Sequence, residues 1–466
     1  MSAQRDDAVS VFCNYATGLK HEDVPVQTRA NVHKFVLDSF GVGVAGSRGP
    51  HVDELISAFC ANSGSGTTRI WGDRRTLSTA VAATCLAYQI HNSEFDCVHE
   101  EAVVHPMAVV LGAMVSICDR LHAQGKPVHG RSFTTAVCAA VDVAAGLGIS
   151  SRSPLKFFRP GTAGLFGVVA GSARLLGLNA RQMRNAMGIA LAQAGGTMQA
   201  HIEGSPVLAM QVGFNARNAV MAVDLAAQNV PGPQQSFEGP FGYLTLFEGD
   251  FDTQQRCESF GSRFLIDEVA HKPFPSGRAT HGIVEACLSM KADSGFDVAD
   301  VQAVNASVPP LTHRLVGRPS HDAMGVNYAR LSGPFVAASA LHFDSVGIEH
   351  FLEDALRDKS VLELATRVEV VADDNPDPNA LTPIRVQITL KNGRVLEKTL
   401  DVIYGHPDNP MSRDAYLQKF RRNWSASREP LGKGDLERCI ELLEDLDNTS
   451  DVSDITYLMH AKARGA

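Results

Sequence analysis

The stretch GTAGLFGVVAGSARLLG, residues 161–177, decides the fold of this 466-residue chain. Its glycines at positions 164, 167 and 171 are three and four residues apart, so they lie on one face of a helix. A glycine inside a helix costs about 1 kcal/mol relative to alanine. That cost is tolerated where a neighbouring helix packs very close. The segment therefore predicts a bundle of tightly packed helices.

The helical pattern continues on both sides of this segment. Stretches rich in alanine and other small residues occur at 80–90, 186–194 and 212–227, and such residues favour helices that pack closely. After residue 412 the pattern is again helical. We expect this C-terminal part to return to the helices of the first 265 or so residues.

The pattern changes near residue 266. Apolar and polar residues alternate over 384–390, Asn392-Gly393 follows, and a second run covers 395–402. Two such runs joined by Asn-Gly are the strongest short-range signal of a β-hairpin. Further strand patterns lie at 301–308 and 368–371, and helical ones at 277–291 and 334–342. The predicted fold is mainly α: a large all-helical domain of residues 1–268 and 405–466, with a smaller α+β lid inserted at 269–404.

Composition limits the class of protein. Hydrophobic residues make up 44% of the chain and charged residues 20%, as in ordinary globular proteins, and the net charge of −9 argues against nucleic acid or an anionic membrane as a partner. The nine cysteines form no C-x-x-C pair, which indicates reduced thiols and a cytoplasmic location. The N-terminus has no apolar signal segment. The longest apolar stretch, at 108–118, is too short to span a membrane and predicts a core helix.

Nucleotide and hydrolase motifs are missing from the sequence. It has no P-loop, no G-x-S-x-G and no H-E-x-x-H, and the Gly-x-Gly at 41–43 lacks the context of a dinucleotide fold. The densest polar cluster is HNSEFDCVHEEAVVHP, residues 91–106, between two apolar helical stretches. Histidines and carboxylates in a cleft can transfer protons near neutral pH. The alternatives are a solvated loop and a metal site, although the spacing fits no standard set of metal ligands.

Two further segments carry cations suited to an anionic substrate. HKPFPSGRATH, residues 271–281, holds Lys272, Arg278 and His281 around a turn. In FFRPGTAG, Arg159 precedes a proline at a predicted helix N-terminus, where anions are favoured. Arginine binds a carboxylate with two parallel donors and lysine as a point charge. The alternatives are an exposed basic linker and a surface cap.

Five segments together resemble the MmgE/PrpD family over nearly the whole chain. They are EFD with the later His-Pro (94–106), RPGTAGLFG (159–167), LLGLNARQMRNAMGIA (175–190), KPFPSGRATH (272–281) and HPDNPMSRDAYLQKF (406–420). The resemblance implies a helical domain from both chain ends, a smaller α+β lid and a homodimer. It also implies reactions without cofactor or metal on small polycarboxylates, such as 2-methylcitrate dehydration, cis-aconitate decarboxylation and iminodisuccinate epimerisation.

The match departs from the family pattern at three places. Glu94-Phe95-Asp96-Cys97-Val98 stands where the family typically has Asp-Phe-Asp-Asp-Thr, so its second Asp of the pair and its Thr are lost. Arg159 stands where a histidine is usual, and Leu208 near a usual lysine. These changes suggest a substrate other than 2-methylcitrate, with fewer carboxylates or with an apolar substituent near Leu208.

The predicted chemistry is proton transfer at a carbon next to a carboxylate. We expect His105 with Asp96 to form the acid–base pair, Glu94 to orient His105 or to share its proton, and His281 to be a second candidate. The predicted substrate-binding residues are Lys272, Arg278, Arg159 and Tyr328. The leading hypothesis is a hydro-lyase that dehydrates a hydroxy-polycarboxylate. The alternatives are an epimerase, a decarboxylase and a non-catalytic carboxylate-binding paralogue.

Overall fold

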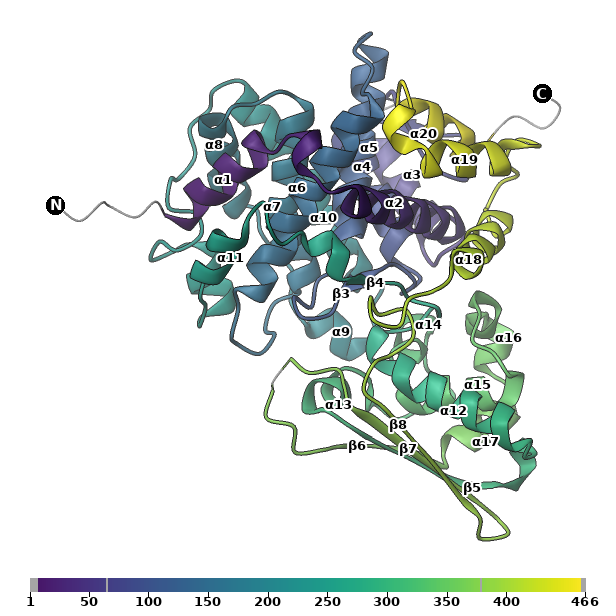
Figure 1. The fold of residues 1–466 in the computed structure, drawn as a ribbon. Coiled ribbons are helices and arrows are strands. Elements are labelled where there is room, and N and C mark those ends of the chain that lie inside the picture. The colour runs from purple at the N-terminus through teal and green to yellow at the C-terminus, as the bar shows by residue number, and fades with distance from the viewer. Residues whose placement is uncertain (1–6, 64–65, 378, 462–466) are drawn as a thin grey trace.

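The computed structural model describes residues 7–63, 66–377 and 379–461. Its buried apolar residues form two main cores, one in the helical part and one in the part that carries the four-stranded sheet (Figure 1). The helices around the first core are α1 (Ala8–Gly18), α2 (Val26–Gly46), α3 (Val52–Ser63), α4 (Thr79–His91), α5 (Pro106–Ala123), α6 (Gly130–Ile149), α7 (Arg159–Leu175), α8 (Ala180–Leu191), α9 (Gln199–Glu203), α10 (Val207–Ala227), α11 (Gln254–Ser259), α18 (Arg413–Ser425), α19 (Asp435–Glu444) and α20 (Ser453–Met459). Two short strands, β1 (Thr68–Arg69) and β2 (Thr76–Leu77), pair beside them.

The glycine-rich segment forms α7, at the centre of the first core. α7 packs against α5, α6 and α10. A Cβ added to Gly167 would lie only 2.6 Å from the carbonyl oxygen of Ala140, and one added to Gly171 would lie 2.5 Å from Met114 Sδ. These glycines therefore let neighbouring helices approach closely, and the prediction of a tightly packed helical bundle is confirmed.

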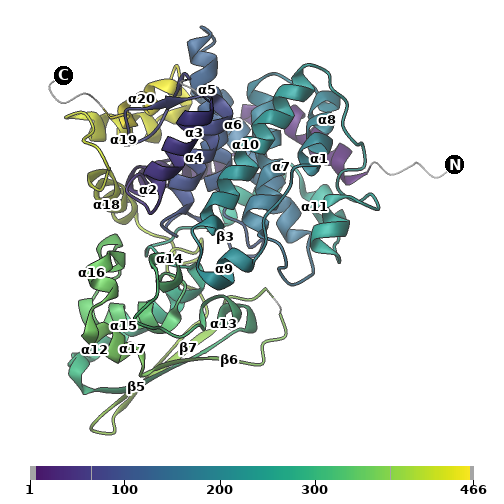
Figure 2. The ribbon, with the colours of Figure 1, turned by 180° about the vertical axis from the view of Figure 1, so that it is seen from behind.

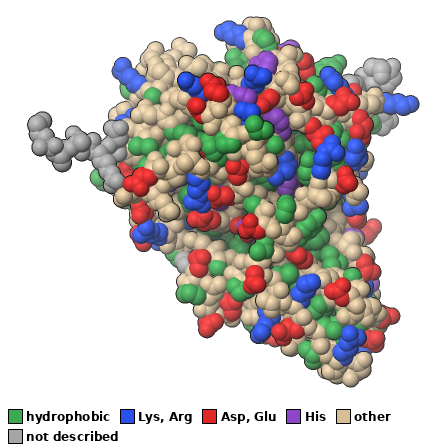
Figure 3. Space-filling model, viewed as in Figure 1, with side chains coloured by type: hydrophobic (Ala, Val, Ile, Leu, Met, Phe, Trp, Pro, Cys, Tyr) green, Lys and Arg blue, Asp and Glu red, His purple; other side chains and the backbone are tan. Residues whose placement is uncertain are grey.

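α5 and α6 are long and apolar enough to cross a membrane by length and composition. However, 83% of the apolar window in α5 and 89% of that in α6 is buried inside the protein. Burial of this kind is what core helices of globular proteins show. Acidic and basic side chains are interspersed over the face shown in Figure 3. None of the nine cysteines forms a disulfide.

The second core lies between a mixed sheet and helices on one side of it. The strands are β5 (Val301–Val308), β6 (Val368–Ala372), β7 (Ile384–Leu390) and β8 (Val395–Leu400), in the order β6-β5-β7-β8. The helices are α12 (His281–Ser294), α13 (Pro310–Val316), α14 (Val326–Ala329), α15 (Gly333–Phe343), α16 (Glu353–Leu356) and α17 (Lys359–Ala365). β7 and β8 pair antiparallel with Ile384 opposite Leu400, as the Asn-Gly signal predicts, and β5 pairs parallel with β6.

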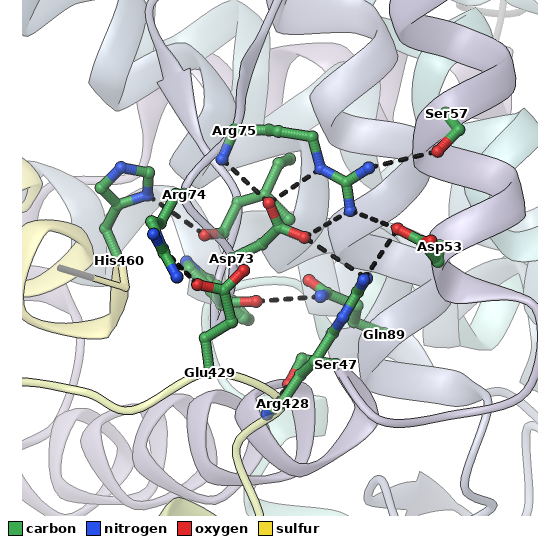
Figure 4. Close-up of polar contacts among 12 residues, drawn as sticks. Ser47, Asp53, Ser57, Asp73, Arg74, Arg75, Gln89, Arg428, Glu429 and His460 are labelled. Carbon is green, nitrogen blue, oxygen red and sulfur yellow. Dashed lines mark hydrogen bonds and ion pairs between the residues drawn. The ribbon is translucent and has the colours of Figure 1, made fainter. Parts of the chain in front are cut away.

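The C-terminal helices return to the first core. α18 and α19 pack against α2, and α20 packs against α5 (Figure 1). A polar network adds to this attachment (Figure 4): Arg428 donates to Asp53 at 2.8 Å and contacts Asp73, which Arg75 also binds. Asp73 is buried, and although burial opposes its charge, these arginines lower its pKa. The predicted boundaries at 268 and 405 stay predictions, and residues 1–6 and 462–466 lie outside the described part.

Candidate active site

Two short strands bring the polar cluster 91–106 to the basic segment 271–281. β3 (Val98–His99) pairs antiparallel with β4 (Val269–Ala270), with Val98 opposite Ala270. α4 ends at His91, and α5 begins with Pro106 directly after His105. Between them Glu94 adopts a positive φ of 52°. The loop therefore turns sharply, and its acidic side chains lie between the two cores.

Asp96 is shared by two histidines at the centre of the site. Its Oδ2 lies 2.9 Å from His91 Nδ1 and 3.2 Å from His105 Nδ1. The centres of the two imidazole rings are 4.9 Å apart. Asp96 is fully buried; burial opposes its charge, yet His91 and His105 hold its pKa well below the usual range. Asp96 is therefore a carboxylate that is hydrogen-bonded to His91 and lies in close ionic contact with His105.

The pKa values of these histidines shift in opposite directions. Burial disfavours the charged form of His91, but the Asp96 and Glu94 carboxylates raise its pKa above the usual value. Burial and the nearby Lys272 ammonium lower the pKa of His105. His91 is therefore the more readily protonated of the two rings. Pairs whose environments separate their pKa values in this way can serve as an acid and a base.

Lys272 and Glu94 form a buried ion pair beside the histidines. Lys272 Nζ lies 2.9 Å from Glu94 Oε2 and donates to the Glu94 carbonyl at 3.3 Å. Burial opposes the charge of Glu94, but Lys272 and the two histidines lower its pKa to about 2. Lys272 is fully buried and does not line the cavity, whereas its partner Glu94 does. The lysine therefore acts on the site by way of the Glu94 carboxylate.

Arg278 forms the second charged wall. Its Nε donates to Glu100 Oε1 at 2.7 Å, and its Nη1 donates to the Tyr404 carbonyl at 2.8 Å. These contacts fix the guanidinium at the junction of the two cores. His281 lies behind it, with Nδ1 3.4 Å from Arg278 Nη1. Burial, with Arg278 and Lys272, lowers the pKa of His281 well below its usual range.

These groups surround a small cavity of about 80 Å³. Its polar lining consists of residues His91, Glu94, Glu100, His105, His201 and Arg278. Most of the remaining wall is apolar and is formed by Val98, Val103, Leu155, Phe158, Pro160, Met198, Leu208, Ala279, Leu315, Val316, Leu331 and Leu381. A few polar groups in an otherwise apolar wall are the usual lining of a small-molecule site.

Helix α18, from the C-terminal part of the chain, contacts the acidic loop. Lys419 on this helix is buried, donates to the Phe95 carbonyl at 2.9 Å and lies 2.7 Å from Asp38 Oδ1. It therefore holds the backbone next to Asp96. This explains how a segment more than 300 residues away in the sequence helps to form the site.

Five predicted site residues lie outside the cavity lining: Asp96, Lys272, Arg159, Tyr328 and His281. Asp96 contacts the two histidines of the lining and Lys272 pairs with Glu94, whereas the other three residues are placed differently. Arg159 is 1% exposed; its guanidinium binds Glu248 at 2.9 Å and also the Ala102 carbonyl and Ser151 Oγ. The Tyr328 hydroxyl donates to the Pro319 carbonyl at 2.9 Å. His281 lies behind Arg278. The polar groups of Arg159 and Tyr328 bind other parts of the protein, and the roles predicted for these two residues and for His281 stay predictions.

The sequence analysis assigned no role to two residues that line the cavity, His91 and His201. His91 was quoted in the polar cluster but received no role, although its position at the end of an apolar helix is a signal that could have found it. His201 gave no such signal. Its Nδ1 lies 3.0 Å from Arg318 Nη2, and burial together with this arginine lowers its pKa to about 4.

The shared carboxylate is also compatible with a metal site. Ligand atoms of His91, Asp96 and His105 lie within 4.8 Å of one another, and imidazole and carboxylate groups bind zinc. However, both Nδ1 atoms face the same Asp96 oxygen, an arrangement that also serves proton transfer. That the reaction needs no metal stays a prediction.

Comparison with known families covers most of the chain. Residues 10–256 match the MmgE/PrpD N-terminal domain, and residues 274–443 match the MmgE/PrpD C-terminal domain. The chain belongs to the MmgE/PrpD family. The resemblance found in the sequence is thereby confirmed, together with the two-domain architecture that it implies.

Similar proteins in this family are named as decarboxylases. The chain is 26% identical to the cis-aconitate decarboxylase of Mus musculus over 465 residues, which cover 96% of this chain and 92% of that protein. It is also 26% identical to the Homo sapiens cis-aconitate decarboxylase, over 96% of this chain and 93% of that protein. A cis-aconitate decarboxylase-like protein of Aspergillus oryzae is 24% identical over 98% of both chains. The chain is an MmgE/PrpD enzyme of the type that acts on carboxylates.

Proposed function

We propose that this protein is a cofactor-independent lyase that moves a proton at a carbon next to a carboxylate of a small polycarboxylate. The observation that carries the proposal is the Asp96 carboxylate shared by His91 and His105, two histidines that line a cavity. Such protons are weakly acidic in water. Positioned acids and bases typically accelerate their transfer by about 10²–10⁴-fold.

The two histidines take different roles. His105 has 14% of its side chain exposed and a lowered pKa, which suits a base near neutral pH. His91 has a raised pKa, which suits an acid. Asp96 stabilises the charge that forms on either ring. Preorganised groups of this kind supply the largest part of catalysis in many enzymes.

Arg278 is the cation that we assign to a substrate carboxylate. It lines the cavity directly, whereas Lys272 acts through Glu94. Leu208 lines the same cavity, where the family pattern has a lysine nearby, and Arg159 is held by Glu248. Fewer cations reach this cavity than the resemblance implies, which supports a substrate with fewer carboxylates or with an apolar substituent.

Decarboxylation is the reaction that the similar proteins favour. In a β,γ-unsaturated carboxylate, the bond to the departing carboxylate breaks and its electron pair becomes a new double bond. The electrons of the old double bond take up a proton, which His91 can donate, and the carboxylate leaves as CO₂. The apolar wall of the cavity favours this step because a charged group is converted into a neutral product.

Dehydration is the second candidate, and the pair of imidazoles favours it. His105 takes a proton from the carbon and His91 gives one to the departing hydroxyl, so that water and an alkene form. The centres of the two rings are 4.9 Å apart, so both can serve one small substrate. Epimerisation requires the same two groups on opposite faces of one carbon and releases nothing.

Proton NMR in D₂O tests these reactions. The purified protein is mixed in turn with hydroxy- and unsaturated di- and tricarboxylates. Loss of CO₂ with one deuterium in the product indicates a decarboxylase, and a new alkene from a hydroxy acid indicates a dehydratase. Exchange without net product indicates an epimerase. Binding with no exchange for any compound would overturn the proposal in favour of a non-catalytic binder.

Two controls complete the experiment. His105→Ala should abolish turnover, whereas His129→Ala, an exposed histidine at the start of α6, should leave it unchanged. Dialysis against EDTA should also leave turnover unchanged. Loss of activity on dialysis that Zn²⁺ restores would assign a metal to His91, Asp96 and His105.

A further inference from the structure

A second cavity lies at the junction of the two cores, and we name it the arginine cavity. Its volume is about 550 Å³, and its walls include Asn92, Ser93, Arg330, Met324, Phe351 and Leu352. Figure 2 shows α14 and α16 facing α2 and α18 across this junction. Consecutive residues serve the two cavities: Ser93 and Arg330 line this one, whereas Glu94 and Leu331 line the active-site cavity.

Arg330 is a buried cation that forms no ion pair within the described part of the chain, although the charge of Glu94 acts on it and opposes the effect of burial. It is 4% exposed, and no described residue forms an ion pair with it. Its Nη1 donates to the Asn92 carbonyl at 2.6 Å, while its Nε has no acceptor. Burial lowers the pKa of Arg330 to about 10. A buried charge without an ionic partner destabilises the folded protein. A bound anion would therefore stabilise Arg330.

The surroundings of Arg330 favour an anion further. The buried Ser93 hydroxyl has no hydrogen-bond partner among the described residues and can donate to a bound anion. Arg48 and Arg357 also line the cavity from exposed positions. Its two acidic residues, Glu349 and Glu353, are likewise exposed, and neither forms an ion pair with these arginines.

The other walls of the cavity are apolar. The Phe351 ring centre lies 5.3 Å from the Arg330 guanidinium carbon. Met324, Val326 and Leu356 complete this wall, and Leu352 is 61% exposed beside it. An exposed leucine next to a buried arginine fits a ligand with an anionic head and a short apolar chain.

We propose that the arginine cavity binds a small monocarboxylate whose carboxylate pairs with Arg330 and whose apolar chain lies on Phe351 and Leu352. This site is separate from the catalytic cavity. The proposal does not depend on the reaction assigned to the protein, because its test measures binding alone.

Calorimetric titration with hexanoate tests the proposal, with hexanamide as a neutral analogue of the same shape. The protein should bind hexanoate at least tenfold more tightly than hexanamide. Leu352→Glu places a negative charge at the cavity on an exposed residue, so folding is not at risk. Its hexanoate affinity should be several-fold weaker than that of Leu352→Gln, the uncharged variant of the same size. Equal affinities in either comparison, or no binding of hexanoate, would overturn the proposal.

Two further variants locate the bound hexanoate. Arg330→Gln should weaken binding at least tenfold; if this variant does not fold, the pair at position 352 decides the question. Leu208→Phe fills space in the catalytic cavity alone and should leave hexanoate affinity unchanged. Loss of binding in Leu208→Phe would place hexanoate in the catalytic cavity and contradict a second site.

Discussion

Arg159 and Asp96 are both buried charged residues. They differ in whether their partners also line the active-site cavity. Around Arg159, the Glu248 carboxylate and the Ala102 carbonyl take up the guanidinium, and the residue does not line the active-site cavity. Around Asp96, two imidazoles share one carboxylate, and both rings line that cavity. A buried charge therefore marks a reactive site only where its partners can also reach a ligand. The experiments below test this difference.

The largest expected effect is on turnover. Asp96→Asn removes the charge that orients both histidines and raises the pKa of His91. We expect the turnover number, measured by NMR with the identified substrate, to fall by about 10²–10⁴-fold. Asp142→Asn is the matched control because Asp142 is as deeply buried, pairs with Arg256 and is no part of the cavity lining. It should lose stability and keep its turnover. An Asp96→Asn protein of nearly normal turnover would refute the assigned role.

Substitution of Arg159 should lower the stability of the protein rather than its turnover. Arg159→Met leaves Glu248 buried and unpaired, so the free energy of unfolding should fall by about 3–5 kcal/mol. The double variant Arg159→Met/Glu248→Leu should recover most of this loss. Urea denaturation measures both. A large rise in KM without loss of stability would instead show that Arg159 binds the substrate.

His201 should make stability depend on pH. Its pKa is lowered to about 4 by burial and Arg318, while an unfolded histidine titrates near 6.5. The unfolded state therefore binds the proton more readily. The contribution to stability is present above pH 6.5 and is lost as the pH falls toward 4, amounting to about 3 kcal/mol.

Urea denaturation at pH 7 and pH 5 checks this prediction. His201→Asn should lose less stability between the two pH values than the unaltered protein does. His51→Asn is the control, because the His51 side chain is 55% exposed and should not change the slope. An unchanged slope in His201→Asn would show that this histidine is not held neutral in the folded protein.

The smallest effect concerns specificity. Leu208→Lys adds a cation to the wall of the active-site cavity, near the place where the family pattern has a lysine. We expect kcat/KM to shift about tenfold toward substrates with one more carboxylate, because a new ion pair in a partly buried site contributes about 1–2 kcal/mol. Competition between matched di- and tricarboxylates measures the shift. A uniform loss for both would indicate that Leu208 only packs.

Local patterns in the sequence predicted much of the fold. The glycines of α7, the Asn-Gly hairpin of β7 and β8, and the strand β5 each depend on a few neighbouring residues. The parallel pairing of β5 with β6 could not be predicted in this way, because it joins segments about sixty residues apart. The homodimer and the cytoplasmic location stay predictions.

The candidate site was predicted less completely. Asp96, Glu94, His105, Lys272 and Arg278 lie together, because β3 and β4 align the two polar segments that contain them. The Arg159–Glu248 ion pair could not be predicted, since Glu248 lies 89 residues away and carries no local signal. His201 was not predicted because a single histidine on a short helix has no sequence pattern that distinguishes a cavity residue from other histidines.

By itself the sequence determined the family, the mainly helical architecture and the two segments that form the site, since each is recorded in short patterns of residue type. Only the tertiary structure decided which charges are neutralised inside the protein and which reach a cavity. It separated Arg159 from the site, added His91 and His201, and left Arg330 without an anion. The physical reason is that the ionic state of a buried group depends on partners that the chain brings close only when it folds.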